Sequence, residues 1–235
     1  MAGVTLKWLS HAGFIIGSPG GCKIIIDPWI VDNPLCPIQL DDITAADIVI
    51  VTHDHFDHSG SAADIVKKTN ATLVAAPETA ARFQSELGVL PQNVVFDGYG
   101  MNIGGSARLK GVTITMTQAL HSSQTACPAG FIISLEDGMV IYHAGDTGIF
   151  QSMRLLGEMY PIDLALLPIG GVFTMDPVQA SKALTLLKPR IAVPMHFRTF
   201  PILEQDARRF VELAGKEAPE VNIVVLEPGQ EQTFQ

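Results

Sequence analysis

The chain of 235 residues contains only three cysteines, and no two of them form a C-x-x-C pair. Cys22, Cys36 and Cys127 are too few and too scattered for a disulfide framework or a zinc finger. No apolar run approaches the roughly 18 residues that span a bilayer. The first residues lack the basic stretch, apolar core and cleavage site of a signal peptide. We therefore expect a reduced, cytoplasmic protein with no membrane span.

Charged residues are also scarce, at 17% of the chain, and the formal net charge is -9. An acidic surface repels phosphate backbones, so we expect no nucleic-acid partner and instead a small-molecule substrate. Apolar residues make up 47% of the chain, which is enough for a large core. The length suits one α/β domain, and we predict that residues 1–235 form a single domain.

Three common functional signatures are missing. The chain has no G-x-S-x-G nucleophile elbow, and Cys127 has no histidine close in sequence that would suggest a dyad. Gly98, Gly100 and Gly104 miss the G-x-G-x-x-G spacing of dinucleotide-binding proteins. These absences argue against a serine or cysteine hydrolase and against a nicotinamide-dependent enzyme.

Apolar runs rich in β-branched residues alternate with helical patterns along the chain. The runs predict strands over 4–9, 13–17, 22–26, 47–52, 72–75, 93–96, 112–117, 130–135, 139–143, 164–168, 191–194 and 221–226. Helices are predicted over 61–68, 78–87, 150–159, 177–187 and 202–213. Continuously apolar strands are typical of sheets covered on both faces, so we predict layered sheets with helices outside.

Residues 53–58, directly after a predicted strand, have the spacing H-x-H-x-D-H. In an extended segment, residues two apart point the same way, so His53 and His55 can bind one ion from one side. A following turn would direct Asp57 and His58 toward a second ion. Imidazole and carboxylate are the usual ligands of zinc, iron and manganese. The alternative, in which these residues only cap a strand and solvate a turn, is the weaker one.

Three more candidate ligands each follow an apolar strand, namely His121, Asp146 and His196. The carboxyl ends of strands form the edge at which α/β sheets build ligand sites. Alone, His121 or His196 would be read as an ordinary core or surface histidine, and Asp146 as a turn residue. The cluster at 53–58 favours ligation, and Asp146 would bridge two ions because a shared anion offsets their repulsion.

Four further residues could support the site or face the substrate. Asp27 could orient the histidine loop or simply form a turn. For His11 and His143, a role beside the ligands or the substrate is balanced by plain packing. Arg198 could bind a substrate phosphate or carboxylate, or form a surface ion pair. The apolar segment 28–35 could cover the substrate or form an oligomer contact.

At these residues the sequence resembles the metallo-β-lactamase superfamily, whose members have H-x-H-x-D-H, a later histidine, a bridging aspartate and a final histidine in this order. The resemblance covers essentially the whole chain and implies an α/β fold, a four-layer αββα sandwich, with the metals at one edge of the two sheets. Segments 8–14 and 143–147 also resemble small metal-dependent hydrolases related to L-ascorbate-6-phosphate lactonase. More distant similarity is to N-acyl-phosphatidylethanolamine phospholipase D and tRNA 3′-processing endonucleases.

The resemblance implies a role for each ligand. The first metal would be bound by His53, His55 and His121, the second by Asp57, His58 and His196, with Asp146 between them. No cysteine stands at the position of Asp146, which differs from the cysteine-containing true β-lactamases and argues against antibiotic hydrolysis.

We therefore predict a hydrolase with two divalent metal ions, zinc in the first place and manganese or iron as alternatives. A metal-bridging hydroxide would attack a small ester, lactone or phosphoester. The catalytic candidates are Asp57, expected to orient the hydroxide and accept its proton, and Asp146. An iron-dependent oxidoreductase on the same fold and a metal-dependent nuclease or phosphodiesterase are the alternatives. A homo-oligomer is compatible with the sequence.

Overall fold

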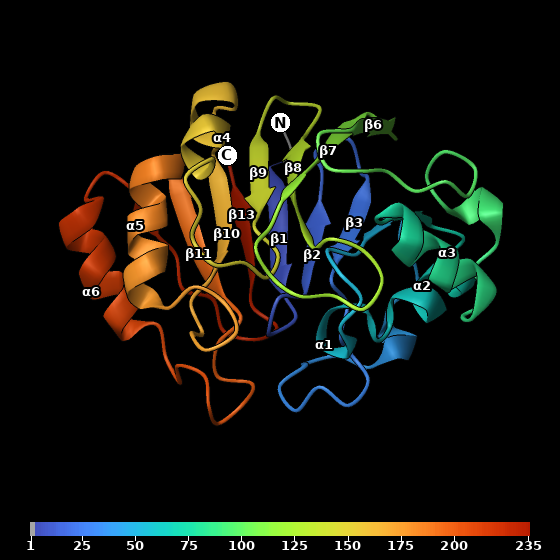
Figure 1. The fold of residues 1–235 in the computed structure, drawn as a ribbon, viewed down its shortest axis with the longest axis horizontal. Coiled ribbons are helices and arrows are strands. Elements are labelled where there is room, and N and C mark those ends of the chain that lie inside the picture. The colour runs from blue at the N-terminus through green and yellow to red at the C-terminus, as the bar shows by residue number, and fades with distance from the viewer. Residues whose placement is uncertain (1–2) are drawn as a thin grey trace.

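In the computed structural model, which describes residues 3–235, two β-sheets pack face to face with helices outside them (Figure 1). The first sheet contains, in spatial order, β13 (Glu231–Phe234), β1 (Val4–Trp8), β2 (Phe14–Gly17), β3 (Lys23–Ile26), β4 (Ile48–Ile50) and β5 (Thr72–Val74). The second contains β12 (Asn222–Ile223), β11 (Ile191–Met195), β10 (Leu164–Pro168), β9 (Val140–His143), β8 (Ala129–Ser134), β7 (Val112–Gln118) and β6 (Ser106–Leu109). The predicted sandwich is confirmed.

The helices lie at the two flanks of the sandwich. One flank has α2 (Ala62–Thr69) and α3 (Pro77–Ser85), and the other has α4 (Met153–Met159), α5 (Pro177–Leu187) and α6 (Arg208–Glu217) (Figure 1). The short α1 (Phe56–Ser59) lies at one edge of the sheets. Among residues 3–235, no helix is long and apolar enough to cross a membrane.

The continuously apolar strands have both faces covered, as their sequences predict. In β3, Ile24 and Ile26 belong to the core between the two sheets, whereas Ile25 belongs to a second core under the helices of that flank. Successive side chains of a strand point to opposite faces, so a strand between two cores needs apolar residues at every position. In β1, by contrast, buried and half-buried residues alternate.

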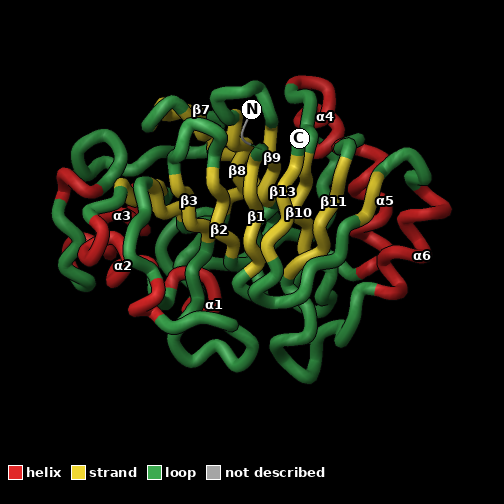
Figure 2. The backbone as a smooth tube through the Cα atoms, turned by 180° about the vertical axis from the view of Figure 1, so that it is seen from behind, coloured by secondary structure: helices red, strands yellow, loops and turns green. Residues whose placement is uncertain are grey.

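The parallel strands determine where the functional residues lie. β3, β4 and β5 run parallel to one another, as do β9, β10, β11 and β12. Parallel strands bring their carboxyl ends to one edge, and the loops around α1 gather along the lower edge in Figure 2. Asp27, His53 and His196 each follow one of these strands within a few residues.

The structure differs from the prediction in several elements. The strand expected over 93–96 is wrong: a 3-10 turn occupies Pro91–Asn93, and Phe96 and Asp97 have positive φ, so only one isolated bridge forms at Val94. The strands β6 and β13 were not predicted, because their sequences are largely polar. The last helix begins at Arg208 and not at residue 202, and α4 begins at Met153 and not at residue 150.

Substitution by alanine is expected to have opposite effects on stability at two glycines that lie in helices. A Cβ at Gly157 in α4 would lie 2.5 Å from the carbonyl oxygen of Leu187 in α5, whereas a Cβ at Gly215 in α6 would meet nothing within 4 Å. We expect Gly157→Ala to lower the free energy of unfolding by about 1–3 kcal/mol through overpacking. Gly215→Ala should raise it by about 0.5–1 kcal/mol, because alanine has the higher helix propensity. Urea unfolding measures both, and equal stability of the two variants would contradict the close approach of α4 and α5.

Candidate metal centre

The predicted ligand segment is extended at first and then helical. His53 follows β4, and His55 is the last extended residue before α1, which carries Asp57 and His58. His53 Nε2 and His55 Nδ1 lie 2.9 Å apart. The start of α1 places His58 beside this pair, with its ring centroid 4.2 Å from that of His53, whereas Asp57 lies next to His11.

A first group of potential ligands contains His53, His55 and His121. Their ligand atoms all lie within 4.8 Å of one another. His121 comes from the loop after β7, and its ring centroid is 5.1 Å from that of His53 and 5.2 Å from that of His55. Residues far apart in sequence thus present three imidazoles to one point.

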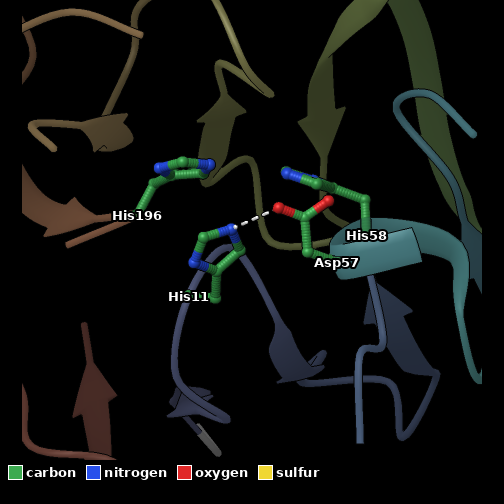
Figure 3. Close-up of side chains that lie close together, drawn as sticks. All are labelled: His11, Asp57, His58 and His196. Atoms are coloured by element: carbon green, nitrogen blue, oxygen red, sulfur yellow. Dashed lines mark hydrogen bonds and ion pairs between the residues drawn. The ribbon is translucent and has the colours of Figure 1, made fainter. Parts of the chain in front are cut away.

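A second group contains His11, Asp57, His58 and His196, and its ligand atoms also lie within 4.8 Å of one another (Figure 3). Nε2 of His11 is 3.2 Å from Oδ2 of Asp57. The centroids of the His11 and His196 rings are 3.8 Å apart. Of these four, only His11 was not among the predicted ligands, because its position after β1 lies outside the H-x-H-x-D-H pattern.

Asp146 lies between the two groups. Its Oδ2 atom is 2.9 Å from Nε2 of His196, 3.3 Å from Nε2 of His58 and 3.5 Å from Nε2 of His121. With His53 and His58 it also forms a third group of mutually close ligand atoms. One carboxylate thus contacts histidines of both groups.

Despite these short distances, several buried polar atoms of this cluster form no hydrogen bond of good geometry among the described residues. They include Nε2 of His58, Nε2 of His196 and Oδ1 of Asp146. A buried polar atom left unpaired costs about 1–3 kcal/mol. Atoms that are close together, aimed at one another and unpaired fit a bound cation, and nitrogen and oxygen donors suit zinc, manganese or iron.

Asp27 fixes the orientation of His58. Its Oδ2 accepts hydrogen bonds from Nδ1 of His58 and Oγ1 of Thr52, both at 2.7 Å, and its Oδ1 accepts one from the Thr52 backbone at 2.8 Å. A proton held on Nδ1 leaves Nε2 of His58 directed at Asp146. Asp27 thus lies where the sequence placed it, next to the histidine loop.

Burial is the main influence on the pKa of two histidines in the cluster. It lowers the pKa of His53 to about 3 and that of His11 to about 4, so both are neutral, as metal ligands must be. Burial opposes the charged form of His58 too, but Asp146 and Asp27 outweigh it and hold its pKa well above the ordinary value. The pKa of Asp146 is well below its ordinary value, because His196 and His58 outweigh the effect of burial.

Three residues of the site have a left-handed backbone. The φ angles of His11, Asp27 and His196 are 50°, 45° and 55°. Positive φ is uncommon outside glycine, and such conformations persist only where the surrounding structure enforces them. Here the sharp bends let side chains that follow β1, β3 and β11 turn into the same region.

Two of the candidate residues lie apart from the cluster. Both ring nitrogens of His143 are engaged in the core, with Nε2 bonded to the Ala12 carbonyl and Nδ1 accepting from the Gly145 N–H. Arg198 pairs with Glu227 at 2.8 Å and does not line the cavity beside the cluster. The packing and surface-pair alternatives therefore describe these two positions better than contact with a substrate.

A cavity of about 780 Å³ opens beside the cluster. Its lining includes His55, Asp57, His121, Asp146 and His196. This volume lies within the range of small-molecule sites, about 300–1,000 Å³. The potential ligands of both groups are therefore accessible to a small substrate.

Asp54, the residue between the first two histidines, supports the site although its sequence position gives no sign of this role. Its buried carboxylate accepts four hydrogen bonds, from Oγ of Ser123, the backbone of Gln124, Oγ1 of Thr125 and Nη1 of Arg82, at 2.7 to 3.0 Å. Three of these donors belong to the loop that carries His121. Asp54 thus joins this loop to the H-x-H-x-D-H segment, and only the structure reveals its partners.

Asp54→Asn should therefore destabilise the protein. The amide nitrogen of the new asparagine would face a hydrogen-bond donor, and Arg82 would lose a charged partner. We therefore expect the free energy of unfolding to fall by about 1.5–3 kcal/mol. Asp64→Asn is the matched control, because Asp64 forms only an exposed pair with Lys67 and should change stability by less than about 0.5 kcal/mol. Urea unfolding compares the two variants, and an equally small effect of both would refute the anchoring role of Asp54.

Comparisons with known proteins agree with the fold and the residue pattern. The family model of the beta-lactamase superfamily domain matches residues 23–197. A UPF0173 metal-dependent hydrolase of Nitratidesulfovibrio vulgaris (strain DP4) is 49% identical over 229 residues, covering 97% of this chain and 95% of that protein. A protein of the same description from Caldivirga maquilingensis is 47% identical over 225 residues, covering 95% of each.

A solved structure gives the same result. Igni18, described as a novel metallo hydrolase from the hyperthermophilic archaeon Ignicoccus hospitalis, has a TM-score of 0.88 and 38% sequence identity, covering 99% of this chain and 98% of that one. The resemblance inferred from the histidine pattern is confirmed. The chain belongs to the beta-lactamase superfamily and, within it, to the UPF0173 metal-dependent hydrolases.

Proposed function

We propose that this protein is a hydrolase that uses two divalent metal ions to cleave a small ester, lactone or phosphoester. The observation that carries the proposal is the pair of ligand groups joined by Asp146 at the side of an open cavity. The relatives' description as metal-dependent hydrolases supports the same activity. Zinc is the first candidate, because the donors are imidazole nitrogens and carboxylate oxygens.

We propose the division of the ligands that the family resemblance implies. One ion would be bound by His53, His55 and His121, the other by Asp57, His58 and His196, and Asp146 would contact both. Bound divalent ions lower the pKa of a water molecule toward neutrality and polarise the oxygen of the scissile group. A pair of ions needs the negative charge of Asp146, whose low pKa keeps it ionised.

Asp57 is placed to orient the attacking water. It lines the cavity, and the hydrogen bond from His11 together with the nearby His58 outweighs burial and holds its pKa below the ordinary value. An ionised carboxylate can accept a hydrogen bond from water and direct its lone pair at the substrate. His11 in turn is hydrogen-bonded through Nδ1 to Oγ1 of Thr199, so it acts as a positioning residue for Asp57.

Removal of the shared carboxylate tests the proposal. In Asp146→Ala we expect the protein, reconstituted with zinc, to hold less than half the metal of the wild type and to lose at least about 100-fold in turnover. Asp206→Asn serves as the control, because Asp206 pairs only with the exposed Arg208 at the surface. Mass spectrometry of the metal content and an ester hydrolysis assay measure the two effects.

Two outcomes would overturn the assignment. One is an Asp146→Ala protein with unchanged metal content and unchanged turnover, which would remove Asp146 from the centre. The other is wild-type protein that, purified without added metal, contains iron and consumes oxygen with a substrate, which would indicate the oxidoreductase alternative. Chelation followed by zinc return should abolish and restore hydrolysis if the proposal holds.

A further inference from the structure

The cavity beside the cluster has an unusually apolar rim. Phe56, Phe173 and Ile202 line it with 64%, 53% and 61% of their surface exposed. Phe200, Phe83 and Leu87 belong to the same lining. Large apolar side chains gathered at one exposed place mark a binding site more often than chance exposure does. Because this rim lies next to the candidate ligands, its apolar character indicates the class of substrate that the cavity binds.

One wall of the cavity is built on a buried tryptophan. Trp29 is only 4% exposed, and its ring is stacked on Phe200 with centroids 5.6 Å apart. Phe56 meets the same tryptophan edge to face, also at 5.6 Å. Three separate segments thus contribute to one aromatic wall, and the buried ring beneath gives Phe56 and Phe200 fixed positions. The loop after β3, which the sequence suggested as a cover for the substrate, instead supports this wall.

Phe173 lines the cavity from a strained loop. Its neighbour Val172 has a φ of 58°, and a β-branched residue with positive φ is a genuine outlier. The loop is held by hydrogen bonds from Gly171 to Met175 and from Met175 to Thr147. Strain of this kind persists where the surrounding structure enforces it. Here the strained loop places Phe173 in the cavity lining, with about half of the side chain exposed.

The lining offers no free cation for an anionic substrate. Arg82 is its only lysine or arginine among the described residues. The guanidinium of Arg82 is already engaged by Asp54 at 3.0 Å, by Glu86 at 3.1 Å and by Gln124. Phosphate binding in proteins usually relies on unpaired arginine or lysine side chains. Among the described residues, the lining therefore has no lysine or arginine other than Arg82 that could offset the charge of a phosphate group.

We propose that the cavity binds the uncharged, apolar acyl or aryl part of a carboxylic ester or lactone. The proposal rests on the proposed hydrolytic function and narrows its substrate class. Water adds to the acyl carbon, the bond between that carbon and the leaving oxygen breaks, and the departing oxygen takes a proton. A linear ester gives an acid and an alcohol, and a lactone gives a hydroxy acid. The aromatic rim takes up the chain while the carbonyl lies at the ligand groups.

Hydrolysis of p-nitrophenyl esters by the zinc-loaded protein tests the substrate class. From acetate to hexanoate we expect kcat/KM to rise by at least about tenfold, since each fully buried methylene is worth up to roughly fourfold. Phe173→Ala should flatten this rise, because it should lower kcat/KM for the hexanoate at least about fivefold more than for the acetate. The matched control is Phe96→Ala, because Phe96 has the same 53% exposure and lies outside the cavity lining. Faster cleavage of p-nitrophenyl phosphate or bis(p-nitrophenyl) phosphate than of any ester would overturn the proposal.

A second measurement needs neither metal nor turnover. The neutral fluorescent probe N-phenyl-1-naphthylamine should bind metal-free and zinc-loaded protein with similar Kd, and Phe173→Ala should weaken binding at least about fivefold. Equal binding by Phe173→Ala and Phe96→Ala would contradict the apolar pocket. If the probe result holds but no ester or phosphoester is cleaved, the hydrolase assignment fails and the apolar site remains.

Discussion

The structure depends on the burial of one carboxylate among imidazoles at the edge of two sheets. Asp146 has Nε2 atoms of His58, His121 and His196 within 3.5 Å of its Oδ2 atom. Burial of this much polar surface is unfavourable unless charge compensates it. Asp146 and Asp27 hold the pKa of His58 well above its ordinary value, which favours a positive charge beside the Asp146 carboxylate. Cations bound by the two groups would supply further positive charge.

The fold supports this arrangement through its two sheets and through residues that have a left-handed backbone. The candidate ligands come from segments that follow strands of both sheets, so packing of the two sheets brings them together. The left-handed backbones at His11, Asp27 and His196 and the anchor at Asp54 fix the directions of the side chains. Hydrogen bonds outside the cluster thus determine its geometry, which is the usual role of the groups that surround a metal.

Much of the candidate site could be predicted from the sequence. The pattern over 53–58 is local, and Asp146 and His196 follow the parallel strands β9 and β11, as the rule for α/β sheets predicts, whereas His121 follows the antiparallel strand β7. For His11 the sequence left a role beside the site and plain packing open, and the role of Asp54 could not be predicted, because both depend on contacts with residues more than 25 positions away. The ion pair of Arg198 could not be predicted for the same reason, since its partner Glu227 lies on another segment.

For the fold, strands buried on both faces were predicted well, because their continuous apolar runs have no other explanation. The polar edge strand β13 and the turn at 91–97 were mispredicted, because pairing with β1 and positive φ depend on tertiary contacts and not on local composition. The apolar rim of the cavity could not be predicted from the sequence either, since Phe56, Phe173 and Phe200 come from three segments.

Anomalous diffraction from crystals of the zinc-loaded protein tests the central claim most directly. The account predicts two peaks on either side of Asp146, one among His53, His55 and His121 and the other among Asp57, His58 and His196. A single peak, or peaks that Asp146 does not touch, would contradict it.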